Sequence, residues 1–309
     1  MTSLKGKDIL HGNQFSKRDI DRMAKIAADF EKELKRKNSL ALLKGKILAT
    51  LFFEPSTRTR LSFETAMQRL GGGVISMASA EGSSAAKGET VGDTARTVSQ
   101  YADVIVIRHP RIGSAIEAAD AASIPVINAG DGAGQHPTQA LLDIYTIRKE
   151  FGSLKSLVVS VVGDLKNGRT VHALVELLSL YQARLYFVSP RNLRMPEEIT
   201  SNLKQKGIEI EETEDLEKAA SESALIYMTR IQKERFVDLT EYERVKGSYV
   251  IDSEFIKRVK KEITILHPLP RVDEISLDVD AYPGSAYFRQ VRNGVFVRMA
   301  LLAMVLGRR

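Results

Sequence analysis

Phe53-Glu54-Pro55-Ser56-Thr57-Arg58-Thr59-Arg60 is the stretch that decides how this chain folds and what it binds. It follows the apolar run 47–52, which predicts a buried strand, and it precedes residues 61–70, whose apolar side chains fall on one helical face. Three glycines at 71–73 predict the end of that helix. The hydroxyls and guanidiniums are therefore expected on a strand-to-helix turn, at a helix N-terminus.

This turn has the chemistry of an anion site. A helix N-terminus offers free backbone N–H groups and the positive end of the helix dipole, which suit an anion such as phosphate. Ser56, Thr57 and Thr59 add hydroxyl donors, and Arg58 adds a permanently charged, bidentate guanidinium. Taken alone, a turn of this kind is more often a capped helix with two solvated arginines. The rest of the chain favours the anion site.

Composition sets wider limits. The chain has 309 residues, of which 43% are hydrophobic and 27% are charged, as expected for a soluble globular protein of two domains. The net charge is +6, with basic residues spread along the chain. This spread predicts no nucleic-acid binding, and it suits either anionic small substrates or general solubility. Cysteine is absent, which excludes disulfides, thiolate metal sites and a cysteine nucleophile.

The sequence also predicts a location. Residues 1–13 are polar and carry no signal-peptide core, and the longest apolar run, 299–306, is too short to span a bilayer. We therefore expect a cytoplasmic protein with no membrane contact.

Strand-like and helix-like segments alternate along the chain. This order predicts an α/β fold of two domains, each a mostly parallel β-sheet flanked by helices. The first domain is predicted over 1–136 and 288–309, because the apolar C-terminal helix is expected to return to it. The second is predicted over 137–287, with 137–151 as a connecting helix. The polar candidates follow the carboxyl ends of the strands, where ligands bind in open α/β sheets.

Three candidates in the first half each have two interpretations. Arg108 ends a strand, where it could hold a carbonyl or phosphate oxygen or form a peripheral ion pair. His136 precedes Pro137, so we expect a neutral ring at a helix N-cap that donates to a carbonyl oxygen; a simple capping histidine is the alternative. Lys87 lies on a mobile loop over 78–90, where a lysine is usually just solvated.

The second half carries a further set of anion-binding candidates. Arg169 follows a strand and resembles a phosphate or carboxylate clamp, although the loop 163–170 lacks the glycine spacing of a dinucleotide site. Arg230 and Gln232 leave another strand end together. Two arginines on separate strands suit a dicarboxylate better than a second phosphate.

These motifs together resemble the aspartate and ornithine carbamoyltransferase family. The stretch 53–60 resembles its carbamoyl-phosphate signature, and His136-Pro137-Thr138-Gln139 resembles its second motif. The resemblance continues through 163–165, 227–235 and 266–275, and so covers nearly the whole chain. Ornithine enzymes of the family carry cysteines where this chain has Thr138 and Pro268. The resemblance therefore implies aspartate as the acceptor.

The resemblance implies a role for each candidate. Carbamoyl phosphate would be bound by Ser56, Thr57, Arg58, Thr59, Ser83, Lys87, Arg108, His136 and Gln139. Aspartate would be bound by Arg169 at its α-carboxylate, by Arg230, Gln232 and Lys87 at its side-chain carboxylate, and by backbone carbonyls near Leu269 and Pro270 at its amine. Catalysis would rest on Thr59, Arg108 and His136, which polarise the carbonyl, and on Arg58 and Lys87, which neutralise the leaving phosphate.

The resemblance also implies a reaction and an assembly. The reaction is carbamoyl transfer from carbamoyl phosphate to the α-amino group of L-aspartate, the committed step of pyrimidine biosynthesis, with no metal or other cofactor. The assembly is a homotrimer in which Ser83 and Lys87 reach the neighbouring subunit's site, with zinc-containing regulatory chains in some family members. Two alternatives remain, namely a carbamoyltransferase for another amino acid such as ornithine, and a non-catalytic binding or scaffold relative.

Overall fold

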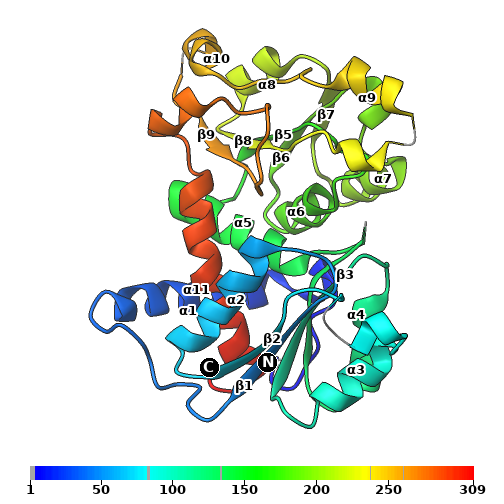
Figure 1. Cartoon of the computed structure of the whole chain (residues 1–309). Helices are drawn as coiled ribbons and strands as arrows, with labels where there is room; N and C mark the ends of the chain where they lie inside the picture. Colours follow the sequence, from blue (N-terminus) through cyan, green and yellow to red (C-terminus); the bar gives the residue numbers. More distant parts are fainter. Residues whose placement is uncertain (1–3, 82–83, 133, 237, 260) are drawn as a thin grey trace. The chain divides into compact units, whose positions relative to one another are not determined.

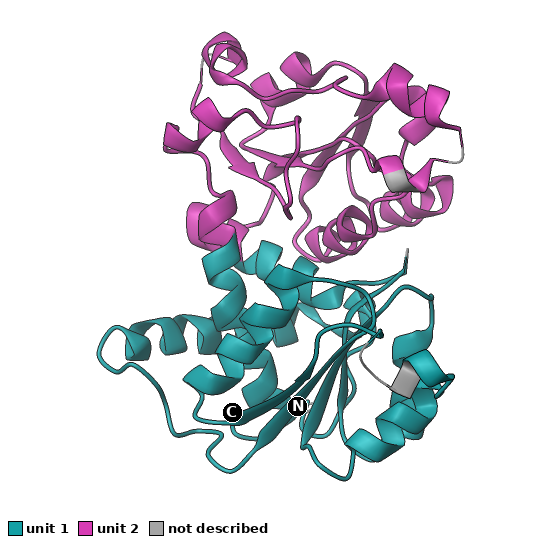
Figure 2. Cartoon of the chain, in the orientation of Figure 1, with its two compact units in different colours: residues 1–145, 291–309 teal, residues 146–290 magenta. Residues whose placement is uncertain are grey.

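The computed structural model describes residues 4–81, 84–132, 134–236, 238–259 and 261–309. The chain divides into two compact units, which Figure 2 colours separately. Unit 1 comprises Met1–Tyr145 and Val291–Arg309, and unit 2 comprises Thr146–Gln290. Both divisions fall inside long helices, and the predicted boundaries lie near the starts of the same two helices.

Unit 1 contains a four-stranded parallel sheet in the order β2-β1-β3-β4. Its strands are β1 (Ile47–Phe52), β2 (Gly73–Met77), β3 (Val104–His109) and β4 (Val126–Asp131). Its helices are α1 (Lys17–Leu34), α2 (Thr57–Arg69), α3 (Val91–Val98) and α4 (Ser114–Ala121), together with most of α5 (Pro137–Phe151) and of α11 (Tyr287–Val305). The C-terminal helix therefore returns to the first unit, as predicted.

Helices cover both faces of this sheet (Figure 1). Alternate residues of β1 and β3, such as Ala49 and Ile105, are buried against α3 and α4 in one hydrophobic cluster. The opposite face buries Leu48 and Val104, and α2 directs its fully buried Phe63 inward. A sheet buried on both faces explains why these strands read as continuous apolar runs in the sequence.

Unit 2 contains a five-stranded parallel sheet in the order β7-β6-β5-β8-β9. Its strands are β5 (Val158–Val162), β6 (Arg184–Val188), β7 (Ile210–Thr213), β8 (Leu225–Met228) and β9 (Thr264–Leu266). Its helices are α6 (Arg169–Ser179), α7 (Glu197–Gln205), α8 (Leu216–Glu222), α9 (Leu239–Val245) and α10 (Ser253–Val259).

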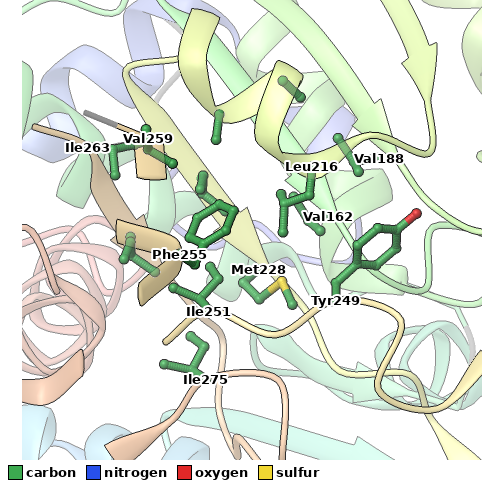
Figure 3. Close-up of a cluster of buried hydrophobic side chains, with 14 of the residues drawn as sticks. Val162, Val188, Leu216, Met228, Tyr249, Ile251, Phe255, Val259, Ile263 and Ile275 are labelled. Carbon is green, nitrogen blue, oxygen red and sulfur yellow. The ribbon is translucent and has the colours of Figure 1, made fainter. Parts of the chain in front are cut away.

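The core of unit 2 packs one face of the sheet against α8 and α10. Figure 3 shows Val162 and Met228 from neighbouring strands beside Leu216 of α8 and Phe255 of α10. Each of these side chains is at most 8% exposed. The two strands in this core, β5 and β8, are also the ones whose ends carry the candidate arginines.

Two helical segments, the first turn of α2 and the whole of α9, lie where the sequence shows no apolar periodicity. α2 begins at Thr57, ahead of the predicted apolar stretch that starts at residue 61, because its first turn is polar. Residues 239–245 form α9, which buries Val245 and is capped by the Asp238 side chain on the Thr240 N–H. Short charged helices of this kind lack an apolar stripe and are stabilised by caps.

Gly163, which follows β5, gives a stability prediction. Its φ is +116°, and a Cβ at this position would lie 2.2 Å from the backbone oxygen of Thr229. Gly163→Ala is therefore expected to lower the free energy of unfolding by about 3 kcal/mol or more, through backbone strain and steric clash together. Urea denaturation followed by circular dichroism measures this change.

Gly152→Ala is the matched control for that experiment. Gly152 also has a positive φ, +74°, but a Cβ there would meet nothing within 4 Å. This variant should lose only about 1–2 kcal/mol, the cost of a left-handed backbone conformation alone. Equal losses in the two variants would contradict the close approach of Gly163 to Thr229.

Candidate active site

The turn between β1 and α2 places its polar side chains at a helix N-terminus, as predicted. Ser56 is the N-cap residue of α2, with φ −155° and ψ 90°, and its side chain makes no capping hydrogen bond to the described residues. The hydroxyl is therefore not used as an ordinary cap, in contrast to the simple capped-helix interpretation. Thr57 and Arg58 are exposed, whereas Thr59 is only 6% exposed.

Arg108 lies beside this turn because β1 and β3 are parallel neighbours that pair Phe52 with Arg108. Its Nη2 lies 3.0 Å from a carboxylate oxygen of Glu54, and its Nη1 donates to the carbonyl oxygen of Ala129 at 3.3 Å. The Arg108 side chain is 12% exposed. The ion pair that the sequence left as an alternative therefore exists, but it lies at the carboxyl end of the sheet, and Arg108 is mostly buried there.

Asp131 organises the loop that leads from β4 towards α5. It pairs with His109 of β3 in the sheet register. One of its carboxylate oxygens accepts from the Gln135 N–H at 2.7 Å, and the other accepts from the Gly113 N–H at 3.0 Å. These bonds fix the backbone immediately before His136.

His136 and Gln139 enter the site from the start of α5. His136 is 4% exposed and directly precedes Pro137, the first residue of the helix, which is the N-cap position predicted from the sequence. Gln139 is 9% exposed, and its Nε2 donates to a carboxylate oxygen of Asp143 at 2.9 Å. The ends of β1, β3 and β4 thus bring the phosphate turn, Arg108 and His136 to one edge of the unit 1 sheet.

Lys87 lies at the far end of a short 3-10 segment, Ser84–Lys87, and its side chain is exposed. Together with Glu81 and Glu89 it lines a hollow of about 690 Å³ beside the edge strand β2. Ser83, which was predicted to contact the phosphate, lies outside the described residues. Its role therefore stays a prediction.

The second set of candidates gathers at the carboxyl edge of the unit 2 sheet. The ends of β5, β8 and β9 are adjacent there, because Val162 pairs with Met228 and Tyr227 pairs with Leu266. The residues that follow these three ends are Arg169, at the first position of α6, Arg230 and Gln232 after β8, and Leu269 and Pro270 after β9. Two guanidiniums, an amide and backbone carbonyls thus follow neighbouring strands.

A buried His–Glu pair holds the segment after β9. Nε2 of His267 lies 2.7 Å from a carboxylate oxygen of Glu274, and Nδ1 of His267 accepts from the Leu269 N–H at 2.8 Å. His267 is 1% exposed. An acceptor Nδ1 requires a neutral ring whose proton lies on Nε2 and is donated to Glu274. Burial lowers the pKa of His267, and the charges of Arg271 and Arg230 lower it further against the opposing charge of Glu274.

This lowered pKa predicts a stability that depends on pH. The folded His267 stays neutral at a pH where the unfolded side chain, with a pKa of about 6.5, takes up a proton. Acidification therefore favours the unfolded state, and the contribution of His267 to the free energy of unfolding is lost as the pH falls below about 6.5. When the pH falls from 7 to 5.5, the free energy of unfolding should therefore decrease in the original chain by about 1 kcal/mol more than it decreases in His267→Asn.

Urea denaturation over this pH range measures the two slopes. At pH 8 the histidine is neutral in both states, so any difference there reports packing alone. Identical slopes for the two proteins would contradict the neutral, buried His267.

Metal-binding and membrane features are not found in the described residues. Across the part of the chain that the structure describes, no three His, Asp or Glu side chains lie together as metal ligands would. In the same residues, no helix has the length and apolar character needed to cross a membrane.

Sequence reasoning missed several residues that hold the site together. Glu54 pairs with Arg108, and Glu274 pairs with His267. Glu54 and Glu274 both lie inside the motifs 53–60 and 266–275. The signal that could have indicated them is an acidic residue close to a buried strand, for Glu54, or to a histidine, for Glu274. Asp143 of α5 and Arg298 of α11 are buried charged residues. Such residues require a partner, but the sequence does not say which.

Two parallel α/β units, each with anion-binding side chains at its strand ends, are typical of enzymes that act on anionic small molecules. Comparison of the sequence with known protein families identifies the enzyme family within this class. Residues 7–149 match the family domain described as aspartate/ornithine carbamoyltransferase, carbamoyl-P binding domain, and residues 155–305 match the Asp/Orn binding domain. The chain belongs to the aspartate/ornithine carbamoyltransferase family.

Individual relatives are similar over their whole length. The aspartate carbamoyltransferase catalytic subunit of Thermococcus gammatolerans is 55% identical, and the alignment covers 98% of each chain. The catalytic subunit of M. jannaschii aspartate transcarbamoylase has a TM-score of 0.91 at 51% identity, covering 97% of this chain and 98% of that one. The Trypanosoma cruzi enzyme in complex with carbamoyl phosphate has a TM-score of 0.93 at 44% identity, covering 98% and 97%.

Proposed function

We propose that this chain transfers the carbamoyl group of carbamoyl phosphate to the α-amino group of L-aspartate, giving N-carbamoyl-L-aspartate and phosphate. The observation that carries the proposal is the 55% identity, over 98% of both chains, to an aspartate carbamoyltransferase catalytic subunit. The two sets of anion-binding residues support it, because each substrate is an anion. In this proposal the reaction supplies pyrimidine biosynthesis in the cytoplasm.

Unit 1 would bind carbamoyl phosphate. The phosphate would accept hydrogen bonds from the first turn of α2 and from the hydroxyls of Ser56, Thr57 and Thr59, with Arg58 as its charged partner. The Ser56 hydroxyl makes no capping hydrogen bond to the described residues, which supports this role. Since the phosphate is already an activated leaving group, the transfer requires no metal and no redox cofactor.

The carbonyl of the carbamoyl group would face Thr59, Arg108 and His136. The aspartate amine attacks the carbonyl carbon, negative charge builds on the oxygen, and donors fixed before the reaction stabilise this charge. The ion pair of Arg108 with Glu54 and its hydrogen bond to the Ala129 carbonyl support such preorganisation. The C–O bond to phosphate then breaks, a proton from the attacking amine passes to the departing phosphate, and Arg58 and Lys87 would neutralise the remaining negative charge.

Unit 2 would bind aspartate. Arg169 would hold the α-carboxylate, whereas Arg230 and Gln232, helped by Lys87, would hold the side-chain carboxylate. Backbone carbonyls of Leu269 and Pro270 would accept from the amine and direct its lone pair. The pair formed by His267 and Glu274 supports this last role, because it fixes the backbone on both sides of these carbonyls. Much of the rate gain is expected from holding two anions in register.

A parallel assay tests the proposal against its alternatives. Purified protein is given carbamoyl phosphate with either aspartate or ornithine, and carbamoylated product is detected colorimetrically. We expect product with aspartate alone. Product with ornithine alone would keep the carbamoyl-phosphate half and overturn the roles of Arg230 and Gln232. No product with either acceptor would favour a binding or scaffold relative.

We further propose a homotrimer in which Lys87 and Ser83 complete the site of the neighbouring subunit. The exposed position of Lys87 and the open edge of β2, where Ile75 is 39% exposed, support a contact with a second copy. The relatives are described as catalytic subunits, and this proposal therefore includes separate regulatory chains, among them zinc-containing ones, as candidate partners of the trimer.

Shared sites predict complementation. Lys87→Ala and Arg58→Ala should each be nearly inactive alone, because each removes a charge from every site. Mixed after mild dissociation, they should regain part of the activity, since some sites in a hybrid trimer receive both intact residues. Activity of the mixture against the separate variants is the measurement. Failure to regain activity in confirmed hybrids would contradict sharing.

A further inference from the structure

Unit 1 contains a buried cluster of three polar residues. It consists of Gln139 and Asp143 on α5 and of Arg298 on α11, with exposed fractions of 9%, 0% and 3%. Charged residues are almost never fully buried unless they are paired. Of these three residues, the family resemblance implies a role only for Gln139, in binding carbamoyl phosphate.

The contact between Gln139 and Asp143 fixes the direction of the glutamine amide. Nε2 of Gln139 donates to a carboxylate oxygen of Asp143 at 2.9 Å. A carboxylate can only accept, so the NH₂ group must face Asp143, and the amide oxygen is presented on the other side. A free glutamine could turn over and present either an acceptor or a donor. Asp143 removes this ambiguity.

Arg298 supplies the countercharge behind Asp143. Burial lowers the pKa of Arg298 to about 10, with the charge of Asp143 opposing that shift, so the guanidinium remains cationic at neutral pH. Its Cζ lies 5.1 Å from the ring centroid of Phe63, a buried residue of α2. Arg298 therefore joins the helix that carries the phosphate turn to the helix that carries Gln139.

The backbone of α11 leaves room for this arginine. A Cβ at Gly294, four residues earlier, would lie 2.5 Å from a terminal nitrogen of Arg298. Side chains in a helix lean towards its N-terminus, which brings Arg298 over this position. The glycine thus allows the guanidinium to lie flat against the helix within the core.

We propose that Asp143 and Arg298 are positioning residues that lock the Gln139 amide with its oxygen towards the substrate, and so select an acyl phosphate that carries an NH₂ group. The proposal rests on the proposed function, because it assumes that carbamoyl phosphate occupies unit 1. An acetyl group has nearly the same shape as a carbamoyl group but offers no donor to the Gln139 oxygen. The cluster is therefore a determinant of carbamoyl over acetyl specificity.

Binding of two matched probes tests this role. Phosphonoacetamide and acetonylphosphonate differ only in an NH₂ or a CH₃ group beside the carbonyl, and neither hydrolyses as carbamoyl phosphate does. Calorimetric titration of each, and of inorganic phosphate, gives three dissociation constants per protein. The original chain should prefer phosphonoacetamide, because only this probe pairs with the Gln139 oxygen.

Asp143→Asn should weaken phosphonoacetamide binding about tenfold, because an amide at 143 no longer dictates the orientation of Gln139. Binding of acetonylphosphonate and of inorganic phosphate should change less than twofold. In a Gln139→Ala background, the same substitution should have no further effect, as expected when one residue acts through another. Gly294→Ala, which displaces Arg298, should show the same selective loss and serves if Asp143→Asn does not fold.

Glu150→Gln is the control on the same two helices. Glu150 of α5 pairs with Arg289 of α11 at 2.9 Å, away from Gln139, and the substitution should leave all three constants unchanged. Equal weakening of all three probes in Asp143→Asn and Gly294→Ala would show a structural role and overturn the positioning role. Unchanged binding in both variants would also overturn the positioning role.

Two results for the original chain bear on the proposed function. If it binds inorganic phosphate but does not prefer phosphonoacetamide, both the positioning role and the assignment of carbamoyl phosphate to unit 1 fail. If it binds none of the probes, the proposed function itself fails.

Discussion

Replacing Arg108 with alanine is expected to lower kcat by about 100- to 1000-fold, the cost of removing one preorganised donor from a developing oxyanion. Arg108 is suited to this role because it is 12% exposed and its guanidinium is already held by Glu54 and by the Ala129 carbonyl. The KM for carbamoyl phosphate should rise far less, since the α2 turn would bind the phosphate. Steady-state kinetics with saturating aspartate separates the two parameters.

Arg111→Ala is the matched control for this prediction. Arg111 lies three residues further on, its side chain is 57% exposed, and it forms an ion pair with Glu117. Its removal should leave kcat within twofold, because exposed ion pairs contribute little. Glu54, which loses its partner in Arg108→Ala, is 33% exposed, and circular dichroism of the variant shows whether it remains folded without that ion pair. A folded Arg108→Ala protein with unchanged kcat would remove Arg108 from the proposed oxyanion site.

The elements that position the first half of the site could be predicted because their signals are local. A buried strand, a polar turn and an apolar helical stripe follow one another between residues 47 and 70, and the structure places β1 and α2 there. Parallel pairing then makes strand ends converge whatever lies between them. The fold class thus predicts that Arg108 lies at the same sheet edge as the phosphate turn, whereas the neighbouring position of β1 and β3, which pairs Phe52 with Arg108, comes from the structure.

The parts that escaped prediction depend on contacts between distant segments. Nothing near Asp143 in the sequence indicates Arg298, because their proximity exists only after α5 and α11 have packed. The neutral state of His267 likewise depends on burial and on the Leu269 N–H, neither of which a motif encodes. Sequence patterns thus predict which element carries a residue, whereas packing decides its partner and its charge.

Replacing Arg230 with alanine is expected to raise the KM for aspartate by about 10- to 100-fold, the loss of a charge-assisted hydrogen bond to a carboxylate. Arg230 follows β8, beside the β5 end that leads to Arg169 and the β9 end that leads to Leu269. Binding of inorganic phosphate should not change, because the phosphate turn belongs to unit 1. Kinetics over a wide range of aspartate concentrations, with phosphate titration alongside, makes the measurement.

Acceptor discrimination gives this prediction its sharpest form. Asparagine has the shape of aspartate without the second carboxylate, so a site built around Arg230 should reject it, and Arg230→Ala should bring the kcat/KM values of the two acceptors closer together. Arg258→Ala, which removes an exposed arginine 2.6 Å from Glu217 in the same unit, should leave the ratio unchanged. If Arg230→Ala kept the full preference for aspartate, the side-chain carboxylate would have to be read elsewhere, and Arg169 would be the next residue to test.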